Sequence, residues 1–189
     1  MGIARFIRRF ARAREGVAAM EFAVAAPVVT LSIAGLIEIS MVLFVTSLME
    51  GGIRDASRFG ITGYVPPNTT RQAQIQKIIS DATIGLIDMS TAVIDTKVYP
   101  SFNDVGKPEP YTDSNGNGHY DVGESFTDIN GNGQWDADMG QEGLGGPSDI
   151  VLYTVTADWH LLTPLMVPVM GSGGKMHLSA SVAVRNEPY

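Results

Sequence analysis

Acidic and amide side chains recur at every second position in two short stretches of the chain. The first stretch places Asp113, Asn115 and Asn117 two residues apart, followed directly by Gly118 and six residues later by Glu124. Side chains with this spacing converge around a tight turn and offer only oxygen ligands, which Ca²⁺ prefers. The stretch agrees with the calcium-loop pattern D-x-[DN]-x-[DN]-G-x5-E at every position. The sequence therefore predicts a Ca²⁺ site with the ligands Asp113, Asn115, Asn117, the carbonyl of His119, Asp121 and Glu124.

A second copy of the pattern follows at a period of 15 residues. Its last position falls on Met139, so Asp138 or Glu142 would have to close a second, weaker site. The predicted ligands of that site are Asp128, Asn130, Asn132, Gln134, Asp136 and Asp138. Aromatic residues recur in register as well: Tyr111 with Phe126, and Tyr120 with Trp135. These aromatics favour a folded pair of loops over the alternative, a disordered acidic linker.

The two loops belong to an acidic insert, residues 104–147. Residues 104–149 carry ten acids and one base, Lys107. Only residues 125–127 separate the loops, which leaves no room for the helices of an EF-hand. The insert resembles the tandem Asp/Asn-Gly calcium loops of extracellular bacterial proteins, and this resemblance implies a calcium-stabilised module.

The N-terminus carries a different set of informative residues. Five arginines, and no acid, precede Glu15: Arg5, Arg8, Arg9, Arg12 and Arg14. A secretory signal has its small-residue cleavage site after the apolar stretch. Here Gly16 lies before the apolar run that starts at Phe22, and Glu21 stands at the mouth of that run. Cleavage after Gly16 would leave the apolar helix in the mature chain, with Val17 at its start, as in a prepilin.

Gly16-x-x-x-x-Glu21-Phe22, followed by Pro27 and Ile37-Glu38, resembles the TadE-like pseudopilins of the tight-adherence (Flp) pilus. The polar, Arg-containing stretch 48–59 is similar to the same family, and the resemblance covers about residues 8–62. It implies a basic prepilin leader at 1–16, cut by a dedicated prepilin peptidase. It also implies a pilin-like helix at 17–62 that contacts other pilin subunits and the pilus assembly machinery. Two features depart from the family: the acidic insert, and Gly51-Gly52, where alanines are expected.

Residues 22–37 carry no charge, and apolar character resumes from 39 to 49. A membrane-spanning helix needs about 20 apolar residues, so this stretch is long enough to cross the cytoplasmic membrane. The arginines predict a cytoplasmic N-terminus and a C-terminal domain outside. Glu38 is the one charged residue within this apolar stretch. It lies either near the far membrane interface or inside the membrane, where helix assembly in a filament gives it a partner. Glu21 is expected to pair with the new α-amino group of Val17, in the same or a neighbouring subunit.

Composition limits the remaining classes of function. The formal net charge is −7 although five arginines fall within residues 1–14, so the rest of the chain is strongly acidic, which argues against nucleic-acid binding. There is no cysteine, so an exported domain must fold without disulfides. The histidines are scattered, and we find no nucleophile motif or phosphate-binding loop. We therefore expect no enzymatic activity.

The region after residue 64 predicts one small α+β domain, residues 64–189. Thr69 or Thr70 can cap a helix over 71–86, with apolar residues at intervals of three and four. Alternating patterns predict strands at 91–98, 149–159 and 176–184. The second alternates through Ile150, Leu152, Val155 and Ala157, and the third through Met176, Leu178, Ala180, Val182 and Val184. We expect a small antiparallel sheet packed on helix, with residues 161–170 as a buried loop or a surface that contacts another subunit.

Two functions compete at this point. The first is a minor pilin of a tight-adherence-type pilus, processed after Gly16 and exposed at the cell surface after assembly. The alternative is an uncleaved single-pass membrane anchor that carries a calcium-dependent surface binding or adhesion module. A mature N-terminus at Val17 favours the first, and an intact leader favours the second.

Overall fold

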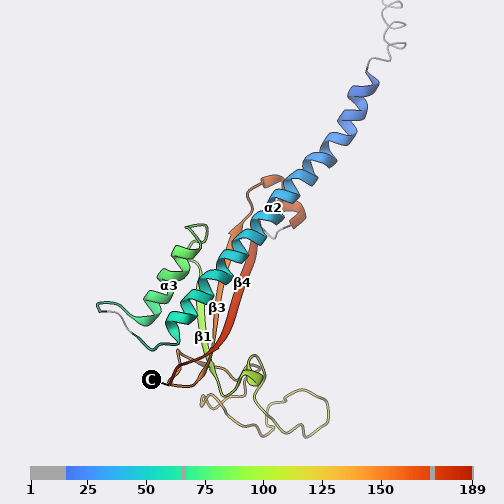
Figure 1. The fold of residues 1–189 in the computed structure, drawn as a ribbon. Helices are drawn as coiled ribbons and strands as arrows, with labels where there is room; N and C mark the ends of the chain where they lie inside the picture. Colours follow the sequence, from blue (N-terminus) through green and yellow to red (C-terminus); the bar gives the residue numbers. More distant parts are fainter. Residues whose placement is uncertain (1–15, 65–66, 171–172, 189) are drawn as a thin grey trace, which may run out of the picture. The chain divides into compact units, whose positions relative to one another are not determined.

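The computed structural model describes residues 16–64, 67–170 and 173–188. The predicted leader lies outside these residues except for Gly16. The chain has an α+β fold in which a long N-terminal helix precedes a small antiparallel sheet (Figure 1). The helices are α2 (Val17–Gly60), α3 (Arg71–Ala82) and α4 (Val167–Met170), with 3₁₀ turns η1 (Phe102–Asp104) and η2 (Pro164–Met166). The strands are β1 (Val93–Tyr99), β2 (Gln141–Glu142), β3 (Ile150–His160) and β4 (Lys175–Arg185). The predicted fold class is confirmed.

The contacts divide the chain into two compact units. The first unit combines the chain up to Val42 with the segment His160–Met176. The second unit comprises Leu43–Trp159 and the chain from His177 onward. Helix α2 runs through both units and ends at Gly60, close to the predicted end at residue 62.

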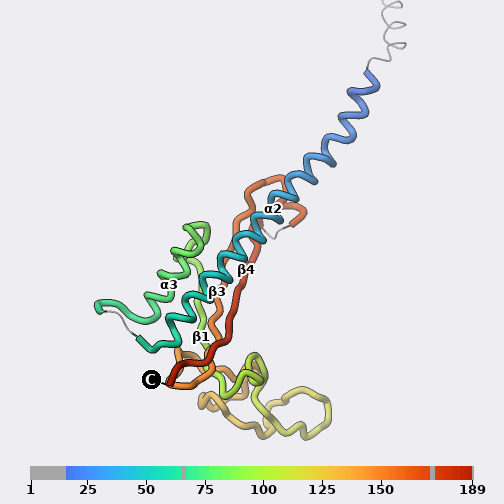
Figure 2. The backbone as a smooth tube through the Cα atoms, viewed as in Figure 1, coloured from blue at the N-terminus to red at the C-terminus, as the bar shows by residue number. Residues whose placement is uncertain are grey.

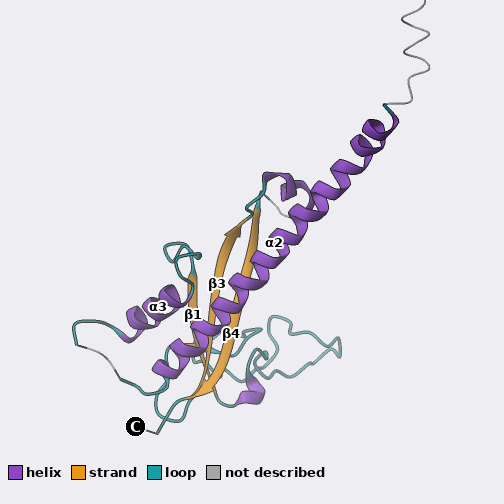
Figure 3. Cartoon of the chain, turned by 45° about the horizontal axis from the view of Figure 1, so that its top comes forward, coloured by secondary structure: helices purple, strands orange, loops and turns teal. Residues whose placement is uncertain are grey.

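In the second unit, α2 and α3 pack closely against each other. The buried face of this part of α2 carries Val45, Met49, Ile53 and Ala56, and that of α3 carries Ile75 and Ile79. Gly52 has no Cβ, and one placed there would lie 3.0 Å from the Cβ of Ala82. The glycine therefore explains the departure from the expected alanine, because it lets the two helices approach. Figures 1 and 3 show α3 and the C-terminal half of α2 on the same side of the sheet.

The order of strands in the sheet is β2-β1-β3-β4. Strand β1 pairs antiparallel with β3, from Val93 opposite Thr156 to Tyr99 opposite Ile150. Ile150, Val155 and Ala157 of β3 are buried, as the alternation predicts, and Val151, Tyr153 and Trp159 are buried as well. Leu152 is the predicted core residue that differs, since it is only half-buried. The apolar residues Ile150 to Tyr153 stand next to one another, so periodicity alone does not fix their phase.

The start of α3 is as predicted, since the Thr70 side chain accepts a hydrogen bond from Ala73 N. The helix ends at Ala82, four residues before the predicted Leu86. Thr83 caps it, and Ile84 then adopts a left-handed conformation with φ of 47°. A β-branched residue rarely takes this conformation, so sequence reasoning gave no reason to place the turn there.

The acidic insert joins β1 to β3 within the second unit. Figure 2 follows it as a looping stretch of tube, yellow-green to ochre, between the two strands. Its ends are fixed by a small core in which Tyr99, Met139 and Ile150 are buried and Val105 and Leu152 pack against them. Lys107 O accepts a hydrogen bond from Met139 N at 2.9 Å, which closes the base of the insert.

Candidate assembly helix and calcium loops

The first loop, residues 113–124, is organised around the carboxylate of Asp113. Its Oδ1 accepts hydrogen bonds from the N–H groups of Gly116 at 2.7 Å and Asn117 at 3.2 Å. Its Oδ2 accepts from Gly118 N at 2.8 Å. These backbone donors, Gly118 foremost, hold the pKa of Asp113 below its usual value. Asp113 is therefore anionic at neutral pH.

The remaining predicted side chains of the first loop meet at Asp121. Its Oδ2 accepts from the Nδ2 atoms of Asn115 at 2.6 Å and of Asn117 at 2.7 Å. A carboxamide turned by 180° about its last bond presents its oxygen in place of nitrogen. Glu124 closes the loop, since its Oε1 accepts from Ser114 N at 2.7 Å and its Oε2 from Asp121 N at 3.0 Å. His119 N donates to Asn117 Oδ1 at 2.8 Å.

The second loop, residues 128–138, repeats this arrangement atom by atom. Asp128 accepts from the N–H groups of Gly131, Asn132 and Gly133 at 2.7, 3.2 and 2.8 Å. The Nδ2 atoms of Asn130 and Asn132 donate to Asp136 Oδ2 at 2.7 and 2.6 Å. Gln134 N donates to Asn132 Oδ1 at 2.7 Å, as His119 N does to Asn117.

Glu109 occupies in the second loop the place that Glu124 occupies in the first. Its Oε1 accepts from Ile129 N at 2.7 Å, and its Oε2 from Asp136 N at 3.2 Å. Glu109 is fully buried, and sequence reasoning missed it because it precedes both loops. A signal was present: Glu109 and Glu124 each stand four residues before the first Asp of a loop, so they share the period of 15.

Asp138, predicted to close the second loop, contacts β1 instead. Its carboxylate accepts from Lys97 Nζ at 2.6 Å and from Tyr99 OH at 2.8 Å. These two bonds lower the pKa of Asp138 although its partial burial opposes ionisation. The hydrogen bond to Asp138 raises the pKa of Lys97, and burial with the same carboxylate raises the pKa of Tyr99 to about 12. Asp138 therefore fastens the end of the insert to the sheet. Glu142, the other candidate, lies opposite Lys97 on β2.

Aromatic side chains and a short bridge join the two loops. Tyr120 stacks on Trp135 with ring centroids 4.5 Å apart, and Tyr111 and Phe126 make edge contacts with this pair. Tyr111 and Phe126 also form an antiparallel bridge. Trp135 Nε1 donates to Glu109 O at 2.9 Å. The recurring aromatics thus form one cluster between the loops.

In the described residues, the side chains of the two loops are not arranged as a cluster of anionic metal ligands. Within the described part of the chain, no three Asp, Glu, His or Cys side chains gather as a metal site. Amides supply two of the three side-chain ends that meet in each loop, so oxygen coordination requires the amides to turn.

The N-terminal part of α2 presents apolar side chains to its surroundings. Large apolar residues are exposed from Val17 through Phe44, whereas Val45, Met49 and Ile53 are buried in the second unit. Among the described residues, α2 is the one helix long and apolar enough to cross a membrane. Pro27 lies inside the helix without ending it. The apolar exposed stretch fits a single-pass membrane protein.

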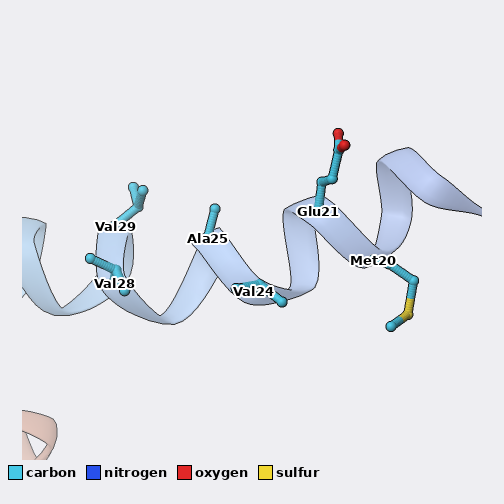
Figure 4. Close-up of a pocket in the computed structure, with 6 residues that line it drawn as sticks. All are labelled: Met20, Glu21, Val24, Ala25, Val28 and Val29. Carbon is cyan, nitrogen blue, oxygen red and sulfur yellow. The ribbon is translucent and has the colours of Figure 1, made fainter.

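Glu21 lies in this apolar surface, together with the other predicted processing residues. It projects from α2 on the same side as Ala25 and Val29 and away from Met20 (Figure 4). Gly16, Val17, Glu21 and Phe22 are all exposed. The N–H of Met20 donates to Gly16 O at 3.0 Å, so the helical bonding starts at the predicted cleavage point.

Comparison with known proteins finds a family match for this helix. Residues 16–58 match the family model of TadE-like proteins. The match supports a TadE-like, pilin-related protein. It covers α2 but not the sheet or the insert. No curated protein and no solved structure matches the chain.

Glu38 is buried within the TadE-like segment. Its Oε1 accepts hydrogen bonds from Thr163 N at 2.5 Å and from Thr163 Oγ1 at 2.9 Å. Its Oε2 is buried and has no hydrogen-bond partner among the described residues. Both groups belong to the first unit, so Glu38 has a partner within its own chain. Its role in subunit assembly stays a prediction.

Proposed function

We propose that this protein is a minor pilin of a tight-adherence-type pilus. The observation that carries the proposal is the TadE-like helix α2, whose exposed apolar surface runs from Val17 to Phe44 with Glu21 at its start. Such a surface requires lipid or other apolar helices around it. The membrane supplies lipid before assembly, and neighbouring subunits supply helices afterwards. TadE-like proteins are a structural family, in keeping with a non-enzymatic role.

Processing would occur after Gly16, with the N-terminus in the cytoplasm and the sheet domain outside. The exposed position of Gly16 supports access by a prepilin peptidase. Cleavage creates a cationic α-amino group at Val17, about four residues or 6 Å of helix from Glu21. In an apolar filament interior a carboxylate requires a counter-charge, because burial of an unpaired charge costs several kcal/mol. Glu21 would then pair with that amino group and set the axial register of subunits.

Substitution of Glu21 tests this proposal, with Glu50 as a matched control. Glu50 is an exposed carboxylate on the same helix but lies beyond the apolar surface. Glu21→Gln is expected to lower incorporation into pili about tenfold or more, since a charge-assisted pair contributes about 1.5–3 kcal/mol. Glu50→Gln should assemble normally. Quantitative immunoblots of sheared pili and membranes give the ratio, and equal incorporation of both variants would refute the pairing.

We further propose that the insert binds two Ca²⁺ ions that stabilise the exported domain. Support comes from the two loops, which repeat the same hydrogen bonds and are each closed by a glutamate, Glu124 or Glu109. This pattern favours Glu109 over Asp138 as the closing ligand of the second loop. The ions would offset repulsion among ten acids in a domain without disulfides. Extracellular modules need an affinity of only ~10⁻⁴–10⁻³ M.

Thermal unfolding of the full chain in detergent tests the calcium proposal. Calcium at about 100 times its dissociation constant stabilises a folded state by ~2.7 kcal/mol. The melting temperature is expected to rise by several degrees between chelator and saturating calcium, and Mg²⁺ at the same concentration should do less. Identical melting curves would show that the loops are an acidic linker, which leaves the pilin proposal intact. The alternative, an uncleaved calcium-dependent adhesion module, would keep this response but retain residues 1–16.

A further inference from the structure

An apolar hairpin, residues 161–170, joins β3 to β4 and contains η2 and α4. It carries no charged residue and includes Pro164 and Pro168. Leu161 N donates a hydrogen bond to Gly174 O at 3.0 Å, which joins the two chain segments at the base of the hairpin. The hairpin and the N-terminal part of α2 belong to the same compact unit.

The hairpin is fixed to one face of α2 by a polar and an apolar contact. Thr163 donates through both its N–H and its hydroxyl to the buried Glu38. One turn earlier, the terminal methyl of Met166 lies 3.4 Å from the position that a Cβ on Gly35 would occupy. Ala34 is buried beside it. Two small residues therefore make room for Met166, and Glu38 sets the position of the hairpin along the helix.

Three apolar side chains of the hairpin are exposed to solvent in the isolated chain. Leu162, Leu165 and Val169 are 51%, 49% and 67% exposed. Burial of such side chains stabilises by roughly 1.5–3 kcal/mol each, so the hairpin would gain from an apolar environment.

The position of the hairpin along α2 places it at a defined depth. The exposed apolar stretch from Val17 to Ile37, which ends at the buried Glu38, is about 30 Å long at about 1.5 Å per residue. This length matches the ~30 Å hydrocarbon core of a bilayer. The contacts at Ala34 to Glu38 then lie within about 5 Å of its C-terminal end. Amphipathic segments bound at a membrane surface reach ~5–10 Å below the headgroups, so the exposed side chains fall in the boundary region of one leaflet.

We propose that the hairpin 161–170 is a second membrane-contacting element, which inserts into the leaflet toward the C-terminal end of α2. The bound surface consists of lipid headgroups and the first acyl carbons, with Leu162, Leu165 and Val169 in contact with them. The short helical turns of η2 and α4 suit this boundary, since unsatisfied backbone groups are not tolerated deeper in the hydrocarbon. The Glu38–Thr163 contact couples the hairpin to the spanning helix, so extraction of α2 from the membrane also removes the hairpin. The proposal rests on α2 spanning the membrane and on no other part of the proposed function.

Single-cysteine labelling of the full chain in lipid nanodiscs tests this inference, since the protein has no native cysteine. An environment-sensitive fluorophore would be attached to Leu165→Cys, and in a second variant to Leu162→Cys. Val28→Cys, on the exposed surface of α2, reports whether the helix spans the bilayer. Val122→Cys, fully exposed in the insert, is the aqueous reference. Lipids brominated near the headgroup end of the acyl chain quench labels in the boundary region, and lipids brominated near its far end quench deeper labels such as Val28→Cys. Iodide quenches labels in water.

We expect brominated lipid to reduce fluorescence at Leu165→Cys and Leu162→Cys at least twofold and to leave Val122→Cys unchanged. If Val28→Cys is quenched by lipid but both hairpin labels respond only to iodide, the hairpin proposal is wrong and the spanning helix stands. If both hairpin labels resist lipid and iodide, the hairpin is covered by protein, such as a second copy of this chain, and the proposal is again wrong. If Val28→Cys is also insensitive to lipid, the spanning assignment fails and the proposal falls with it.

Discussion

At the scale of single residues, Glu109 is the most informative finding, because a residue upstream of both loops closes the second one. Glu124 follows the first loop and bonds to the N–H groups of Ser114 and Asp121. Glu109 makes the equivalent bonds to Ile129 and Asp136. Each loop is thus closed by a glutamate at an equivalent place. In the first loop this glutamate follows the Asp and Asn residues in the chain, and in the second it precedes them.

The first prediction compares Glu109 with Glu142. Glu109→Gln is expected to abolish calcium binding at the second loop and to leave the first loop at full stoichiometry. Both are acids of the insert, but Glu142 is exposed on β2, so Glu142→Gln should retain two sites. Calorimetric titration of the full chain in detergent gives the stoichiometry. Loss of a site with Glu142→Gln alone would show that Glu142 is the closing ligand.

The sequence predicted most of the individual loop residues but not the partners that depend on tertiary contacts. The spacing of Asp113, Asn115 and Asn117 follows from local geometry, since Asx side chains bond to N–H groups a few residues on. Asp138 looked equivalent to a ligand, yet Lys97 and Tyr99 lie 41 and 39 residues away and become its partners only when β1 forms. Thr163, the partner of Glu38, is 125 residues distant and left no local signal.

At the scale of elements, the close approach of α2 and α3 depends on Gly52. A prediction follows from its neighbour Gly51, where an added Cβ meets nothing within 4 Å. Gly52→Leu is expected to destabilise the fold by about 1–3 kcal/mol, because the side chain forces the helices apart. Gly51→Leu should be neutral or slightly stabilising, since Gly costs about 0.5–1 kcal/mol in a helix. Chemical denaturation in detergent measures both, and equal stabilities would refute the tight packing.

Elements with strong periodicity were predictable, and those set by packing were not. The long apolar helix α2, the Thr70 cap and the alternation of β4, with Leu178 and Ala180 buried, agree with the sequence. The start of β3 does not agree, because its apolar run offers a core residue on either face, and Leu152 is only half-buried. Residues 161–170 were predicted as a buried loop or a contact surface. Met166 is buried and Leu165 is exposed, so the buried loop is confirmed in part, while the contact surface stays a prediction.

At the scale of the whole molecule, the family match and the apolar helix support membrane anchoring and a pilus-related role. The sheet domain and its insert lie outside the matched residues. They are therefore the part in which this chain is expected to differ from other proteins that match the same family model. Calcium would act there as a folding ligand, while processing and assembly would depend on the N-terminal end of α2.

The most direct test of the account is the N-terminal residue of the assembled protein, measured by mass spectrometry of purified pili and of membranes. We predict that the pilus-associated chain begins at Val17 and has lost residues 1–16. Gly16→Ala should accumulate at full length in the membrane, whereas Gly51→Ala should be processed normally. Wild-type protein that retains residues 1–16 in assembled pili would contradict the central claim.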